Sequence, residues 1–184
     1  LMMYQPDETR CVAKTLHWDS MPVETLTEFV REHYKPRGHH PLMGAQTWHD
    51  QGEPPAMWKD WCVKAFADAG FAPVVNYKWW ISMFNKQSQK QRGEPNWLNG
   101  FPHEHSWPHG VTLVLMVQPG EGGGENVLID KMGKEFSVSL GVGDAVMIGG
   151  LVNHGVRPVT GGTDRIALIS TAYLEKGSDS WDLS

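Results

Sequence analysis

The first part of the chain carries apolar residues at the spacing of an α-helix. Val23, Leu26 and Val30 fall on one face of a segment that has a proline at its first turn. A second apolar stripe runs through PPAMWKDWCVKAFADAG (54–70), and its final glycine is typical of a helix end. The pattern therefore predicts a helical bracing segment over about residues 1–71.

From about residue 72 the pattern changes to short apolar runs that are rich in β-branched and aromatic residues. These runs are APVVNYKWWISMF, VTLVLMVQ, ENVLID, EFSVSL, DAVMIG, GVRPV and RIALISTAYL. Turn sequences such as PGEGGG, DKMGK, GVG and TGGTD separate them at the interval typical of an antiparallel sandwich or barrel. We therefore predict a single domain over residues 1–184, mainly β with N-terminal helices, whose jelly-roll core covers about residues 72–175.

Composition and charge narrow the class of protein. The 184 residues include 20 Gly and 12 Pro, which suits a turn-rich β protein better than a helix bundle. A formal net charge of −5 argues against a nucleic-acid or anionic-membrane surface. Two cysteines give no disulfide framework, and neither a long apolar run nor a signal-peptide pattern is present. We expect a cytoplasmic protein without a membrane or nucleic-acid partner.

The segment FPHEHSWPHG (101–110) contains three histidines just before a strongly apolar run. If it is extended, His103 and His105 point to the same face and can present two imidazoles to one metal ion, whereas Glu104 points away. Such a pair also arises on surfaces or in hydrogen-bonded turns. The pair therefore needs support from elsewhere in the chain.

That support comes from the later segment GDAVMIGGLVNHGVRPVTGGTDRIALIS. His154 follows an apolar run and a Gly-Gly turn, and Arg165 stands eleven residues further on, at the head of the apolar run RIALIST. Burying a guanidinium is costly unless an anion pairs with it. Arg165 is thus suited to binding a carboxylate, and a surface ion pair with Asp144 or Asp164 is the alternative.

Together these segments resemble the 2-oxoglutarate and iron(II) dependent oxygenases over about residues 76–173. That family carries an H-x-D/E pair on one strand, a distal histidine on a later strand, and an arginine about ten residues beyond it. The resemblance implies a double-stranded β-helix core and an oxygenase that uses O2 to oxidise a small organic substrate. It implies that His103 and His154 bind Fe(II) and that Arg165 binds the far carboxylate of 2-oxoglutarate.

His105 departs from the family pattern, because a carboxylate is usual at that position. Three neutral nitrogens would leave the full charge of the metal uncompensated, which favours an anionic chelate but also makes zinc or copper plausible occupants. We predict His105 as the third ligand. A β-bulge that turns Glu104 inward, replacement by His109, or no third protein ligand remain open.

Other classes share part of this pattern. Cupins have an HxH pair followed by a glutamate, whose position here is His109, and a glycine at the spacing of Gly143 from His154. A three-histidine cupin-like dioxygenase that does not use 2-oxoglutarate is therefore the alternative, together with a non-catalytic β-sandwich that binds a ligand. A three-histidine zinc hydrolase is a fourth possibility. Arg165 and HGVRPV favour the oxygenase.

Aromatic residues bracket the histidine motif and are candidates for the substrate pocket. Trp79 and Trp107, with His109, are expected to contact an aromatic or apolar small molecule, although core packing is the commoner role for such residues. Members of the family often have a hydroxyl two residues after the arginine, where this chain has Ala167. We expect Tyr77 to supply that hydroxyl to 2-oxoglutarate. The expected outcome is hydroxylation, with desaturation or another oxidation left open.

Overall fold

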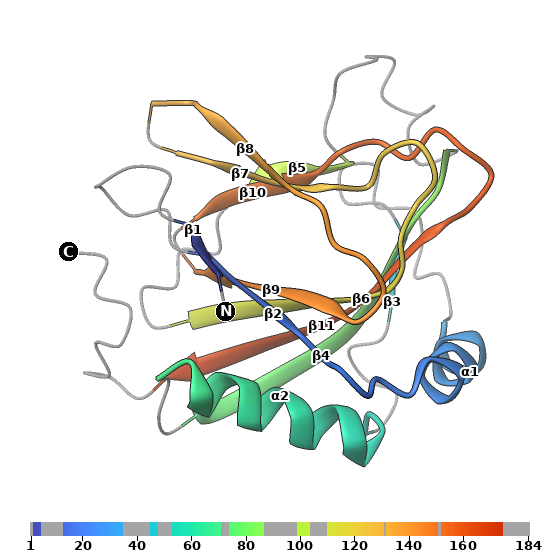
Figure 1. Ribbon diagram of the computed structural model, residues 1–184, viewed down its shortest axis with the longest axis vertical. Coiled ribbons are helices and arrows are strands. Elements are labelled where there is room, and N and C mark those ends of the chain that lie inside the picture. The colour runs from blue at the N-terminus through green and yellow to red at the C-terminus, as the bar shows by residue number, and fades with distance from the viewer. Residues whose placement is uncertain are drawn as a thin grey trace.

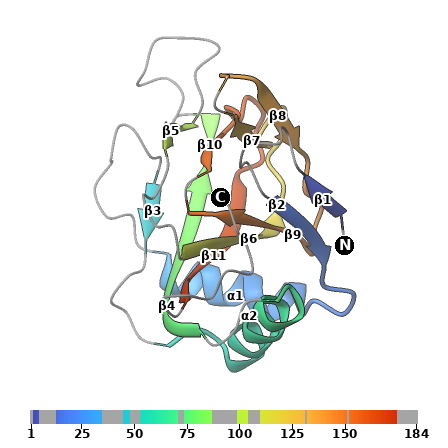
Figure 2. The same ribbon diagram turned by 90° about the vertical axis from the view of Figure 1, so that its left-hand side faces the viewer.

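Two antiparallel sheets lie face to face, and two helices cover the outer face of the larger one (Figures 1 and 2). The computed structural model describes residues 2–4, 13–34, 45–47, 53–70, 74–86, 99–103, 110–130, 132–150 and 152–174. The helices are α1 (Val23–His33) and α2 (Ala56–Asp68). Both lie within the predicted helical segment.

Seven strands form the larger sheet and four form the smaller sheet. In spatial order, the larger sheet contains β1 (Met2–Tyr4), β2 (Ala13–His17), β9 (Asp144–Gly149), β6 (Gly110–Gln118), β11 (Arg165–Leu174), β4 (Val74–Phe84) and β3 (Ala45–Thr47). The smaller sheet contains β5 (Asn99–His103), β10 (Asn153–Val156), β7 (Asn126–Ile129) and β8 (Glu135–Val138).

From β4 onward the chain passes repeatedly between the two sheets. Strands β4, β6, β9 and β11 belong to the larger sheet, and β5, β7, β8 and β10 to the smaller one. This alternation of antiparallel strands winds the chain into a double-stranded β-helix. The predicted fold class is therefore confirmed.

The larger sheet is buried on both faces because successive side chains of a strand point to opposite sides. One face packs on the helices in a helix-facing core that includes Phe29, Trp58, Phe66, Leu113 and Met147. The other face packs on the smaller sheet in an inter-sheet core that includes Trp80, Val114, Met116, Leu128 and Ile169. Burial on both faces explains why β6 reads as a continuous apolar run.

Three short strands extend the larger sheet within the segment that the sequence predicts to be helical. Strand β2 pairs with β9, from Ala13 opposite Ile148 to His17 opposite Asp144. Strands β1 and β3 contain three residues each and β2 contains five, which is too short for a clear period-two pattern.

The end of α2 is joined to this extension by a buried lysine. Lys14 in β2 donates a hydrogen bond from Nζ to the carbonyl oxygen of Ala69, at a distance of 3.0 Å, immediately after α2. A cation is favourable there because the C-terminal end of a helix carries partial negative charge.

In the described parts of the chain, neither helix is long and apolar enough to cross a bilayer.

Candidate functional site

The backbone brings together the two histidines that the sequence predicts as metal ligands. Strand β10 lies between β5 and β7 in the smaller sheet. Within this sheet, His154 is paired with His103 on one side and with Leu128 on the other. Directly opposite residues are nearest cross-strand neighbours and lie on the same face. Because Leu128 belongs to the inter-sheet core, His154 faces the space between the sheets.

A hydrogen bond sets the tautomer of the His154 ring. Its Nδ1 lies 2.8 Å from the carbonyl oxygen of Val152, and the side chain is partly buried. A carbonyl can only accept a hydrogen bond, so Nδ1 carries the proton. In the neutral ring, Nε2 then carries the lone pair that metal coordination requires.

Arg165, the first residue of β11, is buried with only 1% of its surface exposed. Its Nε donates to the carbonyl oxygen of Gly124 at 2.8 Å, and its Nη2 donates to Oδ1 of Asn126 at 3.2 Å. The guanidinium lies 5.6 Å from the ring centroid of Phe84, which is its backbone partner in β4. These contacts fix the guanidinium inside the molecule.

The charge of Arg165 has no acidic counterpart within the described residues. No carboxylate among them forms an ion pair with it, and its Nη1 has no hydrogen-bond partner there. The alternative of a pair with Asp144 is not observed, because that carboxylate lies 2.6 Å from the His17 ring. Burial lowers the pKa of Arg165 to about 10, which still leaves the side chain cationic at neutral pH.

A glycine-rich turn is shaped around Arg165. Gly124 has a φ of +89°, and a Cβ there would lie 3.1 Å from Cδ of Arg165. A Cβ on Gly120 would lie 2.7 Å from Val159 and 3.0 Å from Cβ of Arg165. The sequence marked PGEGGG only as a turn; in the structure its glycines leave room for the arginine.

Glu121 joins this turn to the loop that leads into Arg165. Its Oε2 accepts hydrogen bonds from the backbone N–H groups of Gly162 at 2.8 Å and Thr163 at 3.2 Å. Two loops that are about forty residues apart are thereby held side by side. Their contact fixes the point at which β11 begins.

Asn126 is a polar residue of this site that the sequence did not single out. It is the first residue of β7 and is 3% exposed, and it lies two residues from Leu128 on the same face of the smaller sheet. Asn126 is therefore a diagonal cross-strand neighbour of His154, on the order of 7–8 Å away by the geometry of sheets. The only sequence signal was an amide at the edge of an apolar run.

Tyr77 and Trp79 lie on the other side of the larger sheet from Arg165. Their rings stack with centroids 5.3 Å apart, within the helix-facing core. Tyr77 also contacts Phe66 of α2, and Trp79 contacts Trp58 edge-on. Burial raises the pKa of Tyr77. The structure therefore does not bring either side chain together with the arginine.

Three other predicted site residues, His105, Trp107 and His109, lie outside the described residues, as does Glu104. Within the described part of the chain, no group of three or more His, Cys, Asp or Glu side chains is arranged to hold a metal ion. Of the predicted metal ligands, the structure shows His103 and His154 at paired backbone positions.

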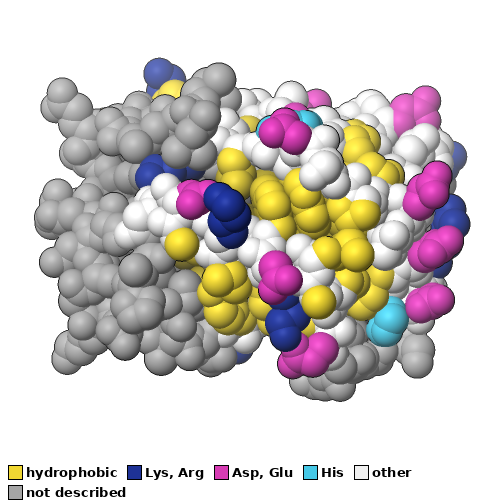
Figure 3. Space-filling view, turned by 60° about the horizontal axis from the view of Figure 1, so that its bottom comes forward, with side chains coloured by type: hydrophobic (Ala, Val, Ile, Leu, Met, Phe, Trp, Pro, Cys, Tyr) yellow, Lys and Arg dark blue, Asp and Glu magenta, His cyan; other side chains and the backbone are white. Residues whose placement is uncertain are grey.

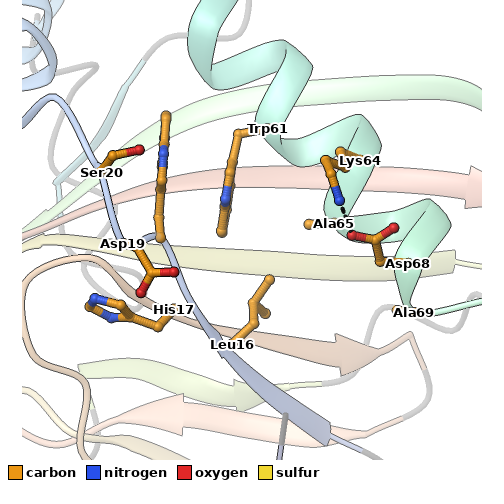
Figure 4. A pocket seen from close by; sticks show the side chains of 10 residues that line it. Leu16, His17, Asp19, Ser20, Trp61, Lys64, Ala65, Asp68 and Ala69 are labelled. Carbon is orange, nitrogen blue, oxygen red and sulfur yellow. Dashed lines mark hydrogen bonds and ion pairs between the residues drawn. The ribbon is translucent and has the colours of Figure 1, made fainter.

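A separate groove of about 540 Å³ opens on the helix side of the molecule, between β2 and α2 (Figure 4). Trp18 and Trp61 stack there with ring centroids 4.9 Å apart. Hydrophobic side chains gather on this side among charged ones (Figure 3). The groove is lined from β2, α2 and the segment after β2, and none of its lining residues belongs to the inter-sheet core.

Comparison with known proteins gives a result at the level of the fold. No protein-family model matches the sequence, and no curated protein matches it. The structure is similar to the non-heme alpha ketoglutarate dependent epimerase SnoN from nogalamycin biosynthesis, with a TM-score of 0.66 and 14% identity over 95% of this chain and 84% of that one. It is also similar to a prolyl hydroxylase from Trichoplax adhaerens, with a TM-score of 0.62 and 12% identity over 90% and 84% of the two chains.

A Pseudomonas putida prolyl-4-hydroxylase is similar too, with a TM-score of 0.55 and 17% identity over 89% of this chain and 93% of that one. These enzymes therefore share the fold of this chain, in which the strands alternate between two sheets. Arg165 lies at the start of β11 in that fold. The chain has the double-stranded β-helix fold of the 2-oxoglutarate and iron(II) dependent oxygenases.

Proposed function

We propose that this protein is a non-haem iron oxygenase that couples the decarboxylation of 2-oxoglutarate to the oxidation of a small organic substrate. The observation that carries the proposal is Arg165, a buried cation on the inter-sheet side of a double-stranded β-helix. Its Nη1 has no partner among the described residues. A buried guanidinium in that state is suited to an anionic ligand.

The surroundings of Arg165 fit the far carboxylate of 2-oxoglutarate. Burial removes water from the guanidinium, so a carboxylate that reaches it would form a strong, charge-assisted hydrogen bond. His154 lies on a neighbouring strand, diagonally across from the arginine's partner Asn126. A dicarboxylate could therefore extend from Arg165 toward the paired histidines.

The available donors also fit iron(II). Imidazole is a common ligand of iron, and the backbone register sets His103 directly opposite His154. We propose His105 as the third ligand, with Glu104 and His109 as alternatives. Iron(II), when bound, supplies the chemistry of oxygen activation.

The protein's own residues bind, orient and exclude water. The hydrogen bond from Nδ1 of His154 to Val152 holds the ring in one tautomer and orientation. The apolar inter-sheet core beneath the site, which includes Trp80 and Met116, excludes water from the buried end of the cosubstrate. Arg165 fixes that end in place, and Trp107 and His109 remain the predicted contacts to an aromatic or apolar substrate.

Calorimetric titration of 2-oxoglutarate into the Fe(II)-loaded protein without oxygen tests the proposal. Arg165→Ala should weaken binding by about 100-fold or more, because a charge-assisted, buried contact is lost, while iron stays bound. Arg157→Ala is the matched control, since that arginine forms an exposed pair with Glu135 at 2.7 Å. Equal affinity in the wild type and Arg165→Ala would contradict the proposal. Metal binding without any binding of 2-oxoglutarate would favour a cupin-like enzyme.

A further inference from the structure

Asn126 and Arg165 form a buried pair that is only partly satisfied. Asn126 is 3% exposed and Arg165 is 1% exposed, and Nη2 of the arginine donates to Oδ1 of the asparagine at 3.2 Å. The remaining donors are Nδ2 of Asn126 and Nη1 of Arg165. Among the described residues, neither has a hydrogen-bond partner.

The direction of the amide follows from the chemistry of the pair. A guanidinium nitrogen can only donate a hydrogen bond, so the asparagine must turn its oxygen toward Arg165. The NH2 group of Asn126 is then directed away from the arginine. The pair therefore offers two donors, one charged and one neutral, from groups that are already joined to each other.

Leaving two buried donors without acceptors is costly, at about 1–3 kcal/mol for each group. A carboxylate carries two acceptor oxygens on one carbon and so can satisfy both donors at once. A ketone or hydroxyl ligand supplies a single neutral oxygen, which forms weaker hydrogen bonds and leaves the charge of the guanidinium unpaired. The chemistry of the pair therefore selects a carboxylate.

We infer that Asn126 is a second anchor of the far carboxylate of 2-oxoglutarate and determines the preference for a dicarboxylate cosubstrate. This inference rests on the proposed function. Asn126 holds Arg165 through its oxygen and receives one carboxylate oxygen through its Nδ2. Because its amide is neutral, the charge of Arg165 stays available to the ligand.

An aspartate at this position has nearly the same shape but the opposite effect. The aspartate would accept the hydrogen bond from Arg165, neutralise the charge of the guanidinium and repel the carboxylate of a ligand. Asn126→Asp should therefore reduce the affinity for 2-oxoglutarate by about 100-fold or more without loss of folding. Asn126→Ala removes the Nδ2 donor and the oxygen that accepts from Arg165 but adds no charge, and it should reduce the affinity by about tenfold.

The test measures binding of 2-oxoglutarate and of 2-oxopentanoate, which lacks the far carboxylate, to the Fe(II)-loaded protein without oxygen. Affinity for 2-oxopentanoate should stay within about twofold in all variants, since only the far carboxylate meets Asn126. Ser137→Asp is the matched control, because it adds the same charge at an exposed position of the neighbouring strand β8. Unchanged affinity of Asn126→Asp for 2-oxoglutarate overturns the inference and leaves the proposed function standing.

Succinate and the metal-free protein separate the two ideas. If succinate raises the unfolding temperature of the wild type but not of Asn126→Asp, the carboxylate site is supported. If 2-oxoglutarate nevertheless fails to bind to the iron-loaded protein, only the proposed function fails. If neither dicarboxylate binds the wild type, both are overturned. If succinate stabilises the wild type and Asn126→Asp equally, the inference alone is overturned.

Discussion

His154 in β10 is the direct backbone partner of His103 in β5. Four strands, β6 to β9, separate these histidines along the chain, and the sheet places them opposite each other. On the other side of the same strand, His154 pairs with Leu128, two residues from the asparagine that holds Arg165. A candidate metal position and a buried cation are thus joined through three adjacent strands.

Replacement of either histidine should remove the metal. His103→Ala and His154→Ala are each expected to reduce bound iron from one equivalent per chain to a small fraction, because each removes an imidazole donor from the centre. Iron content after anaerobic loading and desalting measures this. His17→Ala is the control, since its exposed ring pairs with Asp144 at the start of β9 in the larger sheet. Full iron content in both variants would show that the metal binds elsewhere.

Gly124→Ala should weaken both the fold and the binding of 2-oxoglutarate. The glycine has a φ of +89°, and the new Cβ would press on Cδ of Arg165 at 3.1 Å. We expect a loss of about 2–4 kcal/mol in the free energy of unfolding, of which about 1–2 kcal/mol is backbone strain alone. Urea denaturation measures it.

Gly133→Ala separates the two causes. Gly133 has a similar φ of +81°, but a Cβ there would meet nothing within 4 Å. This variant should show the strain of about 1–2 kcal/mol and unchanged affinity for 2-oxoglutarate. If the two variants lose the same free energy of unfolding and bind 2-oxoglutarate equally well, close packing of the turn on Arg165 contributes to neither stability nor binding.

Tyr77→Phe distinguishes the position seen in the structure from the role expected from the sequence. The ring of Tyr77 stacks on Trp79 in the helix-facing core, away from Arg165. Removal of its hydroxyl should therefore change the affinity for 2-oxoglutarate by less than about twofold. A tenfold loss, measured by calorimetry, would restore the tyrosine as a cosubstrate contact.

The pH dependence of stability should reveal the buried charge of Arg165. Burial lowers its pKa to about 10 in the folded protein, well below the ordinary value that it has in the unfolded chain. Between these values the unfolded chain binds more protons than the folded one, so the destabilising contribution of the charge is present below pH 10 and is relieved as the pH rises. In the ligand-free protein, stability relative to Arg165→Met should increase across this window.

With 2-oxoglutarate present, the rise in stability relative to Arg165→Met should be smaller, because a bound carboxylate favours the charged guanidinium. Urea unfolding of the wild type and Arg165→Met, at matched pH values on both sides of 10, gives the difference. A difference in stability that does not change with pH would mean that the guanidinium is not desolvated in solution.

Much of the fold follows from the sequence because each strand of the core is a short apolar run that is closed by a turn. The positions of His154 and Arg165, each at the start of a strand that follows a glycine-rich turn, were predictable for the same reason. The strands β1, β2 and β3 were not, since runs of three to five residues carry too little periodicity.

The side on which Tyr77 lies was not predictable, for a different reason. Strand β4 is covered on both faces, by helices on one and by the smaller sheet on the other, so apolar residues occur at both parities. Nothing in its sequence says which parity faces the inter-sheet core. Asn126 was missed because its place in the site follows from a hydrogen bond to Arg165, a residue 39 positions away.

The most direct test of the central claim is the absorption spectrum of the Fe(II)-loaded protein without oxygen, before and after addition of 2-oxoglutarate. Chelation of iron by the keto-acid end should produce a metal-to-ligand charge-transfer band in the wild type. Arg165→Ala should require a concentration of 2-oxoglutarate about 100-fold higher or more to reach it, and Arg157→Ala should behave as the wild type. Absence of the band in the iron-loaded wild type, at saturating 2-oxoglutarate, would contradict the assignment as a 2-oxoglutarate-dependent oxygenase.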